Sequence, residues 1–278
     1  MQEILTDIFT WSWFSEPHQY DFNGYLVRHE AGNLCIDPVP PSDADLAEIA
    51  RIGTAKILLT NRNHSRAANV VRSRTGAETL IHPEDAAHAR SQGAIIDGEL
   101  RVGEKVGVLT VVAVPGKSPG EAALYWPERK LLIVGDAVIG NPPGRCGLLR
   151  EKVMDDPAQL RRSVRGLLDL EFDALLFGDG TPIIEGAEAR LMELVESFPA
   201  RTRGSWVRIL PGAPLFNDLA AKTKSSFLPW DRCGTSYPPV RADLTEFKHF
   251  AAETKSSFLV VGPRGICFCT SAFAVGDA

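Results

Sequence analysis

The segment Gly116-Lys117-Ser118-Pro119-Gly120 contains residue types that two kinds of catalytic loop use. A phosphate-binding loop needs a glycine five positions before Gly116, and that position holds Val111 in a predicted strand. The hydrolase motif G-x-S-x-G needs a backbone N–H on the residue after the serine, and Pro119 has none. Both interpretations are therefore excluded.

Polar residues also gather in four loops, each directly after a predicted strand. The loops are 60–66, 115–120, 135–137 and 178–180, and the strands before them are 56–59, 106–114, 131–134 and 174–177. With both motifs excluded, these strand-end loops are the candidate site.

The elements that carry these loops alternate between strands and helices. Further strands are predicted at 25–27, 33–37, 79–81 and 122–126, where turn residues bound short apolar runs. Helices are predicted at 43–52, 65–74, 83–91, 159–168 and 187–197. Strand–helix alternation mixed with hairpins predicts an α/β sandwich with mixed sheets.

The chain changes character after about Pro199 and contains an internal repeat there. Segments 216–228 and 247–259 share nine of thirteen residues at an offset of 31. Two copies are too few for a solenoid, so a duplicated helix–strand unit in a small appended α+β lobe is expected. The loop 229–239 between the copies is either a rigid connector or an interface, and Cys267 and Cys269 are expected on one side of the last strand.

Composition limits the classes of function that remain. The chain has 278 residues, 44% hydrophobic and 23% charged, as is typical of a globular protein. A net charge of −5 and the lack of a Lys/Arg block argue against nucleic acid as a partner. No apolar run is long enough to span a membrane. Five scattered cysteines without CxxC spacing, and an acidic N-terminus, predict a reduced, cytoplasmic protein.

In order and spacing, the strand-end loops resemble the metallo-β-lactamase superfamily, in particular its glyoxalase II-like hydrolases. The resemblance covers residues 1–198 and includes 23–27 and the Asp37-Pro38 strand end. Its most specific parts are 115–120, 123–125 and 135–137. It implies a four-layer αβ/βα sandwich over 1–198, and the lobe expected from the repeat at 199–278 lies outside it.

The resemblance also places the family's metal ligands on particular residues. In the family the ligands come from a loop H-x-H-x-D-H, the histidine of the P-G-x-S/T-P-G turn, a bridging aspartate and a last histidine. In this chain the loop positions hold Asn61, Asn63, Ser65 and Arg66. The three later positions hold Lys117, Asp136 and Asp179, in that order. Only Asp136 keeps the family's residue type. Amide oxygens are poor zinc ligands, and cationic side chains repel a metal ion. We therefore expect no metal ligands and no cofactor.

A buried Asp136 without metal would need other positive charge, because an unpaired buried carboxylate costs several kcal/mol. We expect a salt-bridged cluster of Arg66, Lys117, Asp136 and Asp179, with the groups within about 6 Å of one another. His64 holds a position whose side chain points away from the site in the family, so it is expected outside the cluster.

Three functions follow from this pattern. The simplest alternative is that Asp136 and Arg66 have only a structural role in a former active site that has no remaining function. The first is a pseudoenzyme that binds a small polar or anionic molecule in the former metal cleft; its binding residues would be Asn61, Asn63, Arg66, Lys117, Asp136 and Asp179. The second is an ester or thioester hydrolase that uses Lys117 and Asp136, either with Lys117 as general base or with a divalent metal at Asp136 and Asp179. The third is an interaction protein that acts through the C-terminal lobe, with a homodimer as one form of it. The sequence identifies neither ligand nor substrate.

Overall fold

The computed structural model describes residues 1–199 completely. It describes the backbone alone in four further stretches, 206–211, 240–241, 257–261 and 267–271. The chain divides into two compact units, Met1–Phe198 and Pro199–Ala278. Each unit is described by itself.

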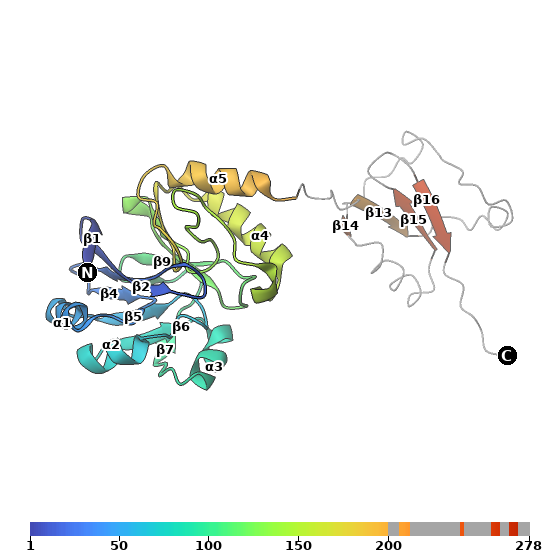
Figure 1. The fold of residues 1–278 in the computed structure, drawn as a ribbon. Coiled ribbons are helices and arrows are strands. Elements are labelled where there is room, and N and C mark those ends of the chain that lie inside the picture. The colour runs from blue at the N-terminus through green and yellow to red at the C-terminus, as the bar shows by residue number, and fades with distance from the viewer. Residues whose placement is uncertain (200–205, 212–239, 242–256, 262–266, 272–278) are drawn as a thin grey trace. The chain divides into compact units, whose positions relative to one another are not determined.

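The first sheet of the N-terminal unit has seven strands in sequence order. They are β1 (Gln2–Leu5), β2 (Ile8–Ser15), β3 (Tyr20–Val27), β4 (Leu34–Ile36), β5 (Lys56–Leu59), β6 (Glu78–Ile81) and β7 (Gly98–Glu99). β1 to β4 pair antiparallel, and β4 to β7 pair parallel. The outer face of this sheet is covered by α1 (Asp43–Ile52), α2 (Ala68–Thr75) and α3 (Pro83–Ser91) (Figure 1).

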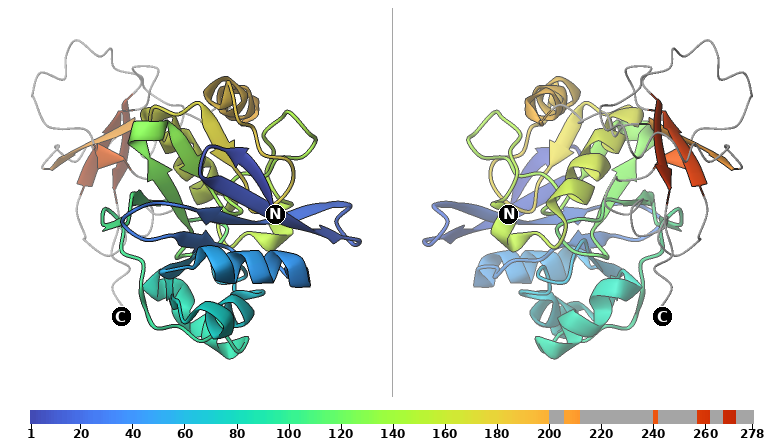
Figure 2. Two further views of the ribbon diagram at one scale, coloured as in Figure 1. Left: turned by 90° about the vertical axis from the view of Figure 1, so that its left-hand side faces the viewer. Right: turned by 90° about the vertical axis from the view of Figure 1, so that its right-hand side faces the viewer.

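The second sheet has five strands in the order β12-β11-β10-β9-β8. They are β8 (Lys105–Val106), β9 (Leu109–Ala113), β10 (Ala122–Trp126), β11 (Leu131–Ile133) and β12 (Ala174–Leu176). Only β11 and β12 pair parallel. The helices α4 (Pro157–Gly166) and α5 (Ala187–Ser197) cover its outer face (Figures 1 and 2). Short 3₁₀ turns, η1 (Pro127–Arg129), η2 (Glu151–Val153) and η3 (Leu167–Asp169), lie between these elements.

Three apolar layers hold the unit together. Side chains of both sheets meet in the central layer, which includes Tyr25, Leu58, Leu124 and Ile133. A second layer joins the first sheet to α1, α2 and α3, and a third joins the second sheet to α4 and α5. The predicted α/β class with mixed sheets is confirmed.

Local signals explain most element boundaries. The Ser42 hydroxyl accepts a hydrogen bond from the Asp45 N–H at the start of α1, and Gly53 ends that helix with a φ of 82°. Pro83 opens α3, as predicted.

Several predicted elements differ in extent from those observed, and two of the differences have a clear local cause. The helix expected at 65–74 begins only at Ala68, because residues 61–67 form turns around the site. The strand expected at 106–114 is the hairpin β8–β9, since Gly107 turns the chain with a φ of 60°.

The C-terminal unit contains a four-stranded sheet in the order β14-β13-β15-β16. Its strands are β13 (Trp206–Pro211), β14 (Val240–Arg241), β15 (Ser257–Val261) and β16 (Cys267–Ser271). The predicted last strand with both cysteines is therefore present as β16. The first repeat copy, 216–228, and the loop 229–239 lie outside the described residues, as does all of the second copy before Ser257.

Among the described residues, no helix has the length and apolar character needed to cross a membrane.

Candidate functional site

The candidate site lies where strands of both sheets end. β4 and β5 are parallel neighbours in the first sheet, and β11 and β12 are parallel neighbours in the second. The Ala122 N–H, at the start of β10, donates to the Thr60 carbonyl of the loop after β5 at 2.8 Å. The Gly178 N–H joins the loop after β12 to the Gly135 carbonyl of the loop after β11 at 2.9 Å. We call the seven side chains that meet there the strand-end cluster: Asn61, Asn63, His64, Arg66, Lys117, Asp136 and Asp179.

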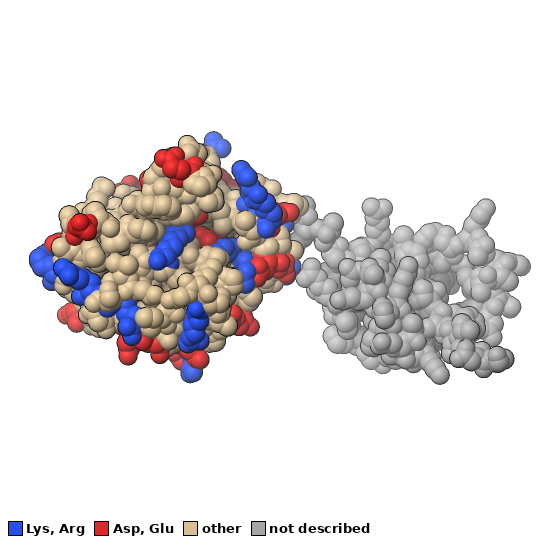
Figure 3. All heavy atoms as spheres, turned by 60° about the horizontal axis from the view of Figure 1, so that its bottom comes forward, with Lys and Arg blue, Asp and Glu red and all other residues tan. Residues whose placement is uncertain are grey.

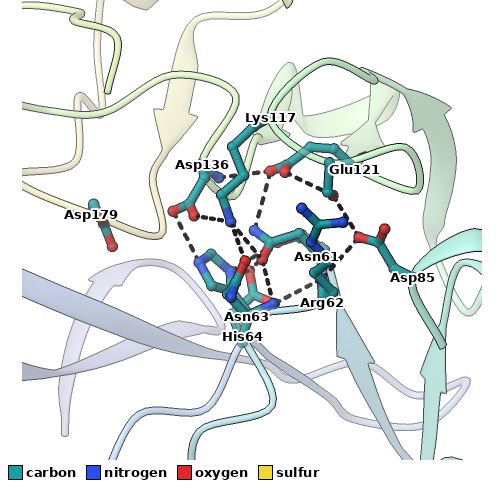
Figure 4. A network of polar contacts seen from close by, with 12 residues as sticks. Asn61, Arg62, Asn63, His64, Asp85, Lys117, Glu121, Asp136 and Asp179 are labelled. Carbon is teal, nitrogen blue, oxygen red and sulfur yellow. Dashed lines mark hydrogen bonds and ion pairs between the residues drawn. The ribbon is translucent and has the colours of Figure 1, made fainter. Parts of the chain in front are cut away.

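Lys117 lies in the middle of this cluster (Figure 4). Its ammonium nitrogen lies 2.8 Å from Asp136 Oδ2, 2.7 Å from Asn63 Oδ1 and 3.2 Å from Asn61 Oδ1. The residue is only 5% exposed. Burial alone would lower the pKa of Lys117, but the charges of Asp136 and Glu121 raise it above its usual value. The side chain is therefore a protonated internal cation.

His64 lies inside the cluster, so the expectation that it would point away from the site is wrong. Nε2 lies 2.9 Å from Asp136 Oδ1, and Nδ1 lies 2.9 Å from Asp37 Oδ2. Burial opposes charge on the ring, yet Asp136 and Asp37 raise the pKa of His64 to about 9. Gly178 makes room for the ring, because a Cβ there would lie 2.6 Å from His64 Cε1.

Arg66 forms the second ion pair of the cluster, with Asp179 at 3.3 Å from Nη2 to Oδ1. The guanidinium carbon lies 4.2 Å from the centre of the Phe22 ring, which is a cation–π contact. Nη1 is buried and has no hydrogen-bond partner among the described residues. Arg66 therefore keeps an unused donor, although its side chain is 17% exposed.

Glu121, which directly precedes β10, forms hydrogen bonds to the cluster and was missed by the sequence analysis. Its Oε1 accepts hydrogen bonds from the Asp136 N–H at 2.9 Å and from Asn61 Nδ2 at 3.2 Å. Burial raises the pKa of Glu121 to about 8, against the opposing charge of Lys117. The signal was available, because an acidic residue directly before the apolar strand β10 requires a partner.

Asp85 on α3 holds two of the loops in place. It accepts hydrogen bonds from the Ser118 hydroxyl at 2.5 Å, the Gly120 N–H at 3.0 Å and the Arg62 N–H at 2.9 Å. The Ser118 side chain is therefore used for structure, in agreement with the exclusion of a nucleophile elbow.

The two central carboxyl groups have opposite pKa shifts. Burial would raise the pKa of Asp136, but His64 and Lys117 hold it well below its usual range. Burial and the charge of Asp136 raise the pKa of Asp179 to about 7, and Arg66 only partly opposes this. The electrostatic compensation of Asp136 is thus stronger than that of Asp179.

The comparisons with known proteins agree with this architecture. The family model of the metallo-beta-lactamase superfamily matches residues 3–198. The chain belongs to the metallo-beta-lactamase superfamily. No curated protein matches it.

Solved structures of the superfamily share the fold. TTHA1429 of Thermus thermophilus, a metallo-beta-lactamase family protein, is 21% identical with a TM-score of 0.54, over 70% of this chain and 80% of that chain. TTHA1623 in a di-iron-bound form is 28% identical with a TM-score of 0.51, over 65% and 98%. The DIM-1 metallo-beta-lactamase is 17% identical with a TM-score of 0.58, over 71% and 97%.

By spacing alone, three buried side chains of this superfamily member could hold a metal ion. One ligand atom each of His64, Asp136 and Asp179 lies within 4.8 Å of the other two. The same atoms have other partners, however. Both ring nitrogens of His64 and both carboxylate oxygens of Asp136 are hydrogen-bonded, and the Lys117 ammonium adds a positive charge beside them. An ion bound by these three residues would have to replace some of these hydrogen bonds and share the site with the Lys117 charge.

Of the residues that the sequence analysis assigned to the site, the structure brings the main set together. The Lys117–Asp136 and Arg66–Asp179 ion pairs are both present, as the expected salt-bridged cluster requires. Asn61 and Asn63 contact Lys117. Ser65 is partly buried beside them in the turns that follow β5.

Proposed function

We propose that this protein is a metal-independent member of the superfamily that binds a small anionic or polar molecule. The molecule would bind at Arg66 and Asn63, the residues of the strand-end cluster that are at least partly exposed. In this proposal the family's ligand positions are held by Asn61, Asn63, Ser65, Arg66, Lys117 and Asp179, and the bridging aspartate is Asp136. Side-chain cations of the chain replace the charge that metal ions supply elsewhere in the superfamily.

The observation that carries the proposal is the unused donor of Arg66. A buried N–H without an acceptor costs about 1–3 kcal/mol, so a ligand gains that energy if the partly exposed guanidinium turns and brings Nη1 to it. A carboxylate or phosphate oxygen is the acceptor that a guanidinium binds best. Asn63, in the same loop, is exposed and offers an amide group. The ring of Phe22 supports the guanidinium from its other side.

The face drawn in Figure 3 favours a small anion rather than a polyanion as ligand. On the face drawn in Figure 3, Lys and Arg side chains of the described unit are separated from one another by acidic and uncharged residues. A polyanion is bound by a contiguous basic patch, whereas a small anion needs one or two donors.

Thermal unfolding and calorimetry with a panel of phosphate, sulfate, acetate and succinate test the proposal on the full chain. We expect at least one anion to raise the unfolding temperature and the Arg66→Gln variant to lose most of this effect. Arg72→Gln is the matched control, because Arg72 pairs with Asp97 on the surface at 2.8 Å. Equal responses of wild type and Arg66→Gln, or no response to any anion, would contradict the proposal.

A metal-dependent hydrolase is the second candidate, and the spacing of His64, Asp136 and Asp179 favours it. The di-iron-bound form of TTHA1623, at 28% identity, is consistent with it. In that case the three residues would hold the ion, which would polarise an ester or thioester and activate water. Lys117 as general base has less support, because its pKa is raised and a base must be neutral.

Metal content by mass spectrometry, on protein purified without chelating resin, separates the two candidates. About one equivalent of metal that Asp136→Ala removes would favour the hydrolase; less than about 0.1 equivalents would favour the metal-independent binding protein. An interaction role for the C-terminal unit stays a separate prediction, since most of the residues that would carry it lie outside the described ones.

A further inference from the structure

The surroundings of the Lys117 ammonium are those of a bound cation. Three oxygens from two different loops lie within 3.2 Å of Nζ: Asn61 and Asn63 Oδ1 from the loop after β5, and Asp136 Oδ2 from the loop after β11. A lysine ammonium has three N–H donors, so these three acceptors use all of them. None remains for an external ligand, which distinguishes Lys117 from Arg66.

We propose that the Lys117 ammonium occupies the position of a divalent cation, and that shortening this one side chain opens a metal site. The inference rests on the metal independence proposed above and goes beyond it, because it predicts metal binding that the wild-type chain does not have. The ligands would be the three oxygens that Lys117 now contacts, from Asn61, Asn63 and Asp136. His64 and Asp179 are further candidates, because each has a ligand atom within 4.8 Å of one of Asp136.

Charge supports the exchange. Removal of Lys117 leaves Asp136 buried at 4% exposure with His64 as its remaining ion-pair partner. A buried carboxylate that has lost a partner is strongly destabilised unless another cation enters. Entry of a cation therefore removes the cost of the substitution.

Chemistry indicates which cation would enter. Two amide oxygens and a carboxylate oxygen are hard ligands, and such sets favour Mn²⁺ or Mg²⁺; the imidazole of His64 adds a nitrogen, which Mn²⁺ and Zn²⁺ accept. Mn²⁺ is therefore the probe that suits every donor in the set.

The experiment compares four full-length proteins after dialysis against MnCl₂ and then metal-free buffer. They are wild type, Lys117→Ala, Lys117→His and the control Lys130→Ala, in which an exposed lysine paired with Glu171 is removed. Bound manganese is measured by mass spectrometry, and unfolding temperature is measured with and without Mn²⁺. We expect about one equivalent in both Lys117 variants and less than about 0.1 in wild type and Lys130→Ala.

A second substitution tests the ligands. The double variant Lys117→Ala/Asp136→Asn should lose the bound manganese and the rise in unfolding temperature. If Lys117→Ala does not fold without metal, Lys117→His decides, because its imidazole fills part of the space and is itself a ligand.

Two results would overturn the inference in distinguishable ways. Folded Lys117 variants that bind no more manganese than wild type would overturn it alone and leave the anion-binding proposal intact. Stoichiometric metal in wild-type protein would overturn it together with the metal independence on which it rests.

Discussion

Asp136 and Asp179 have matching places in the fold but meet their cations differently. Ile133 of β11 and Leu176 of β12 are register partners, and each carboxylate follows three residues later. Asp136 has a cation on each oxygen, at 2.8 and 2.9 Å, whereas Asp179 has one cation at 3.3 Å. The pKa of Asp136 is held well below its usual range, while that of Asp179 is raised to about 7.

The cluster therefore has two parts. We call the surroundings of Asp136, with Lys117 and His64, the structural half, and the surroundings of Asp179, with Arg66, the open half. Around Asp136, buried donors and acceptors are matched, and Glu121 fixes the backbone of the loop. Around Asp179, the cation keeps an unused N–H and a partly exposed side chain. A site for an external ligand is expected where the internal partners leave hydrogen-bonding capacity unused.

The largest expected effect is that of Asp136→Asn, which tests the structural half. The substitution leaves Lys117 and His64 buried without their shared carboxylate, so we expect a loss of about 3–5 kcal/mol in the free energy of unfolding. Urea denaturation followed by circular dichroism measures it. Glu48→Gln is the control, because this carboxylate pairs with Arg51 at the surface, and it should cost about 1 kcal/mol or less. Equal losses in the two variants would mean that burial does not distinguish them.

The second effect is a loss of stability as pH rises. The folded-state pKa of His64, about 9, lies above its unfolded value of about 6.5, so its contribution is complete below pH 6.5 and is lost toward pH 9. Asp179 and Glu121 keep protons up to about 7 and 8, so their ionisation acts in the same direction.

We expect this loss to be of the order of 1–3 kcal/mol between pH 6.5 and 9, and His64→Gln to reduce the slope. Chemical denaturation at several pH values measures it, with His88→Gln on the exposed side of α3 as control. An unchanged slope in His64→Gln would show that the imidazole is neutral in the folded protein.

The sequence predicts much of the fold because local signals agree with tertiary packing. The strand at 56–59 and the helices at 83–91 and 187–197 are found with the predicted bounds, since apolar runs, prolines and caps mark their ends. The helix at 65–74 is shortened because its first turn is used by the site, where loop contacts override propensity.

The sequence analysis named six of the seven residues of the strand-end cluster, but not His64 and not the inner arrangement. Parallel strands of one sheet end at the same edge, so the polar residues after them meet. The inward position of His64 depends on Asp37 from the neighbouring strand and on the space at Gly178, and neither is visible in the loop's own sequence. Glu121 lies next to a strand rather than in a ligand position, so the family resemblance does not point to it.

Arg66→Gln tests the open half and should change stability little. The substitution removes a weak ion pair and a cation–π contact, but it also removes a buried unsatisfied N–H. These terms are each about 1 kcal/mol and partly cancel, so the net loss should stay within about 1 kcal/mol. Urea denaturation of the variant checks this. A loss comparable to that of Asp136→Asn would place Arg66 in the structural half.

The smallest expected effect is that of Asp179→Asn, and its sign is informative. At pH 8 the carboxylate is ionised at a cost, because it is buried beside Asp136, so the neutral amide should stabilise the protein by up to about 1 kcal/mol. At pH 5 the folded protein keeps the Asp179 proton but the unfolded chain has mostly lost it, so the stabilisation by the variant should be smaller than at pH 8. Paired denaturation curves at the two pH values measure both. A loss at pH 8 above about 2 kcal/mol would show that Arg66 compensates Asp179 as fully as Lys117 and His64 compensate Asp136, and the distinction between the two halves would fail.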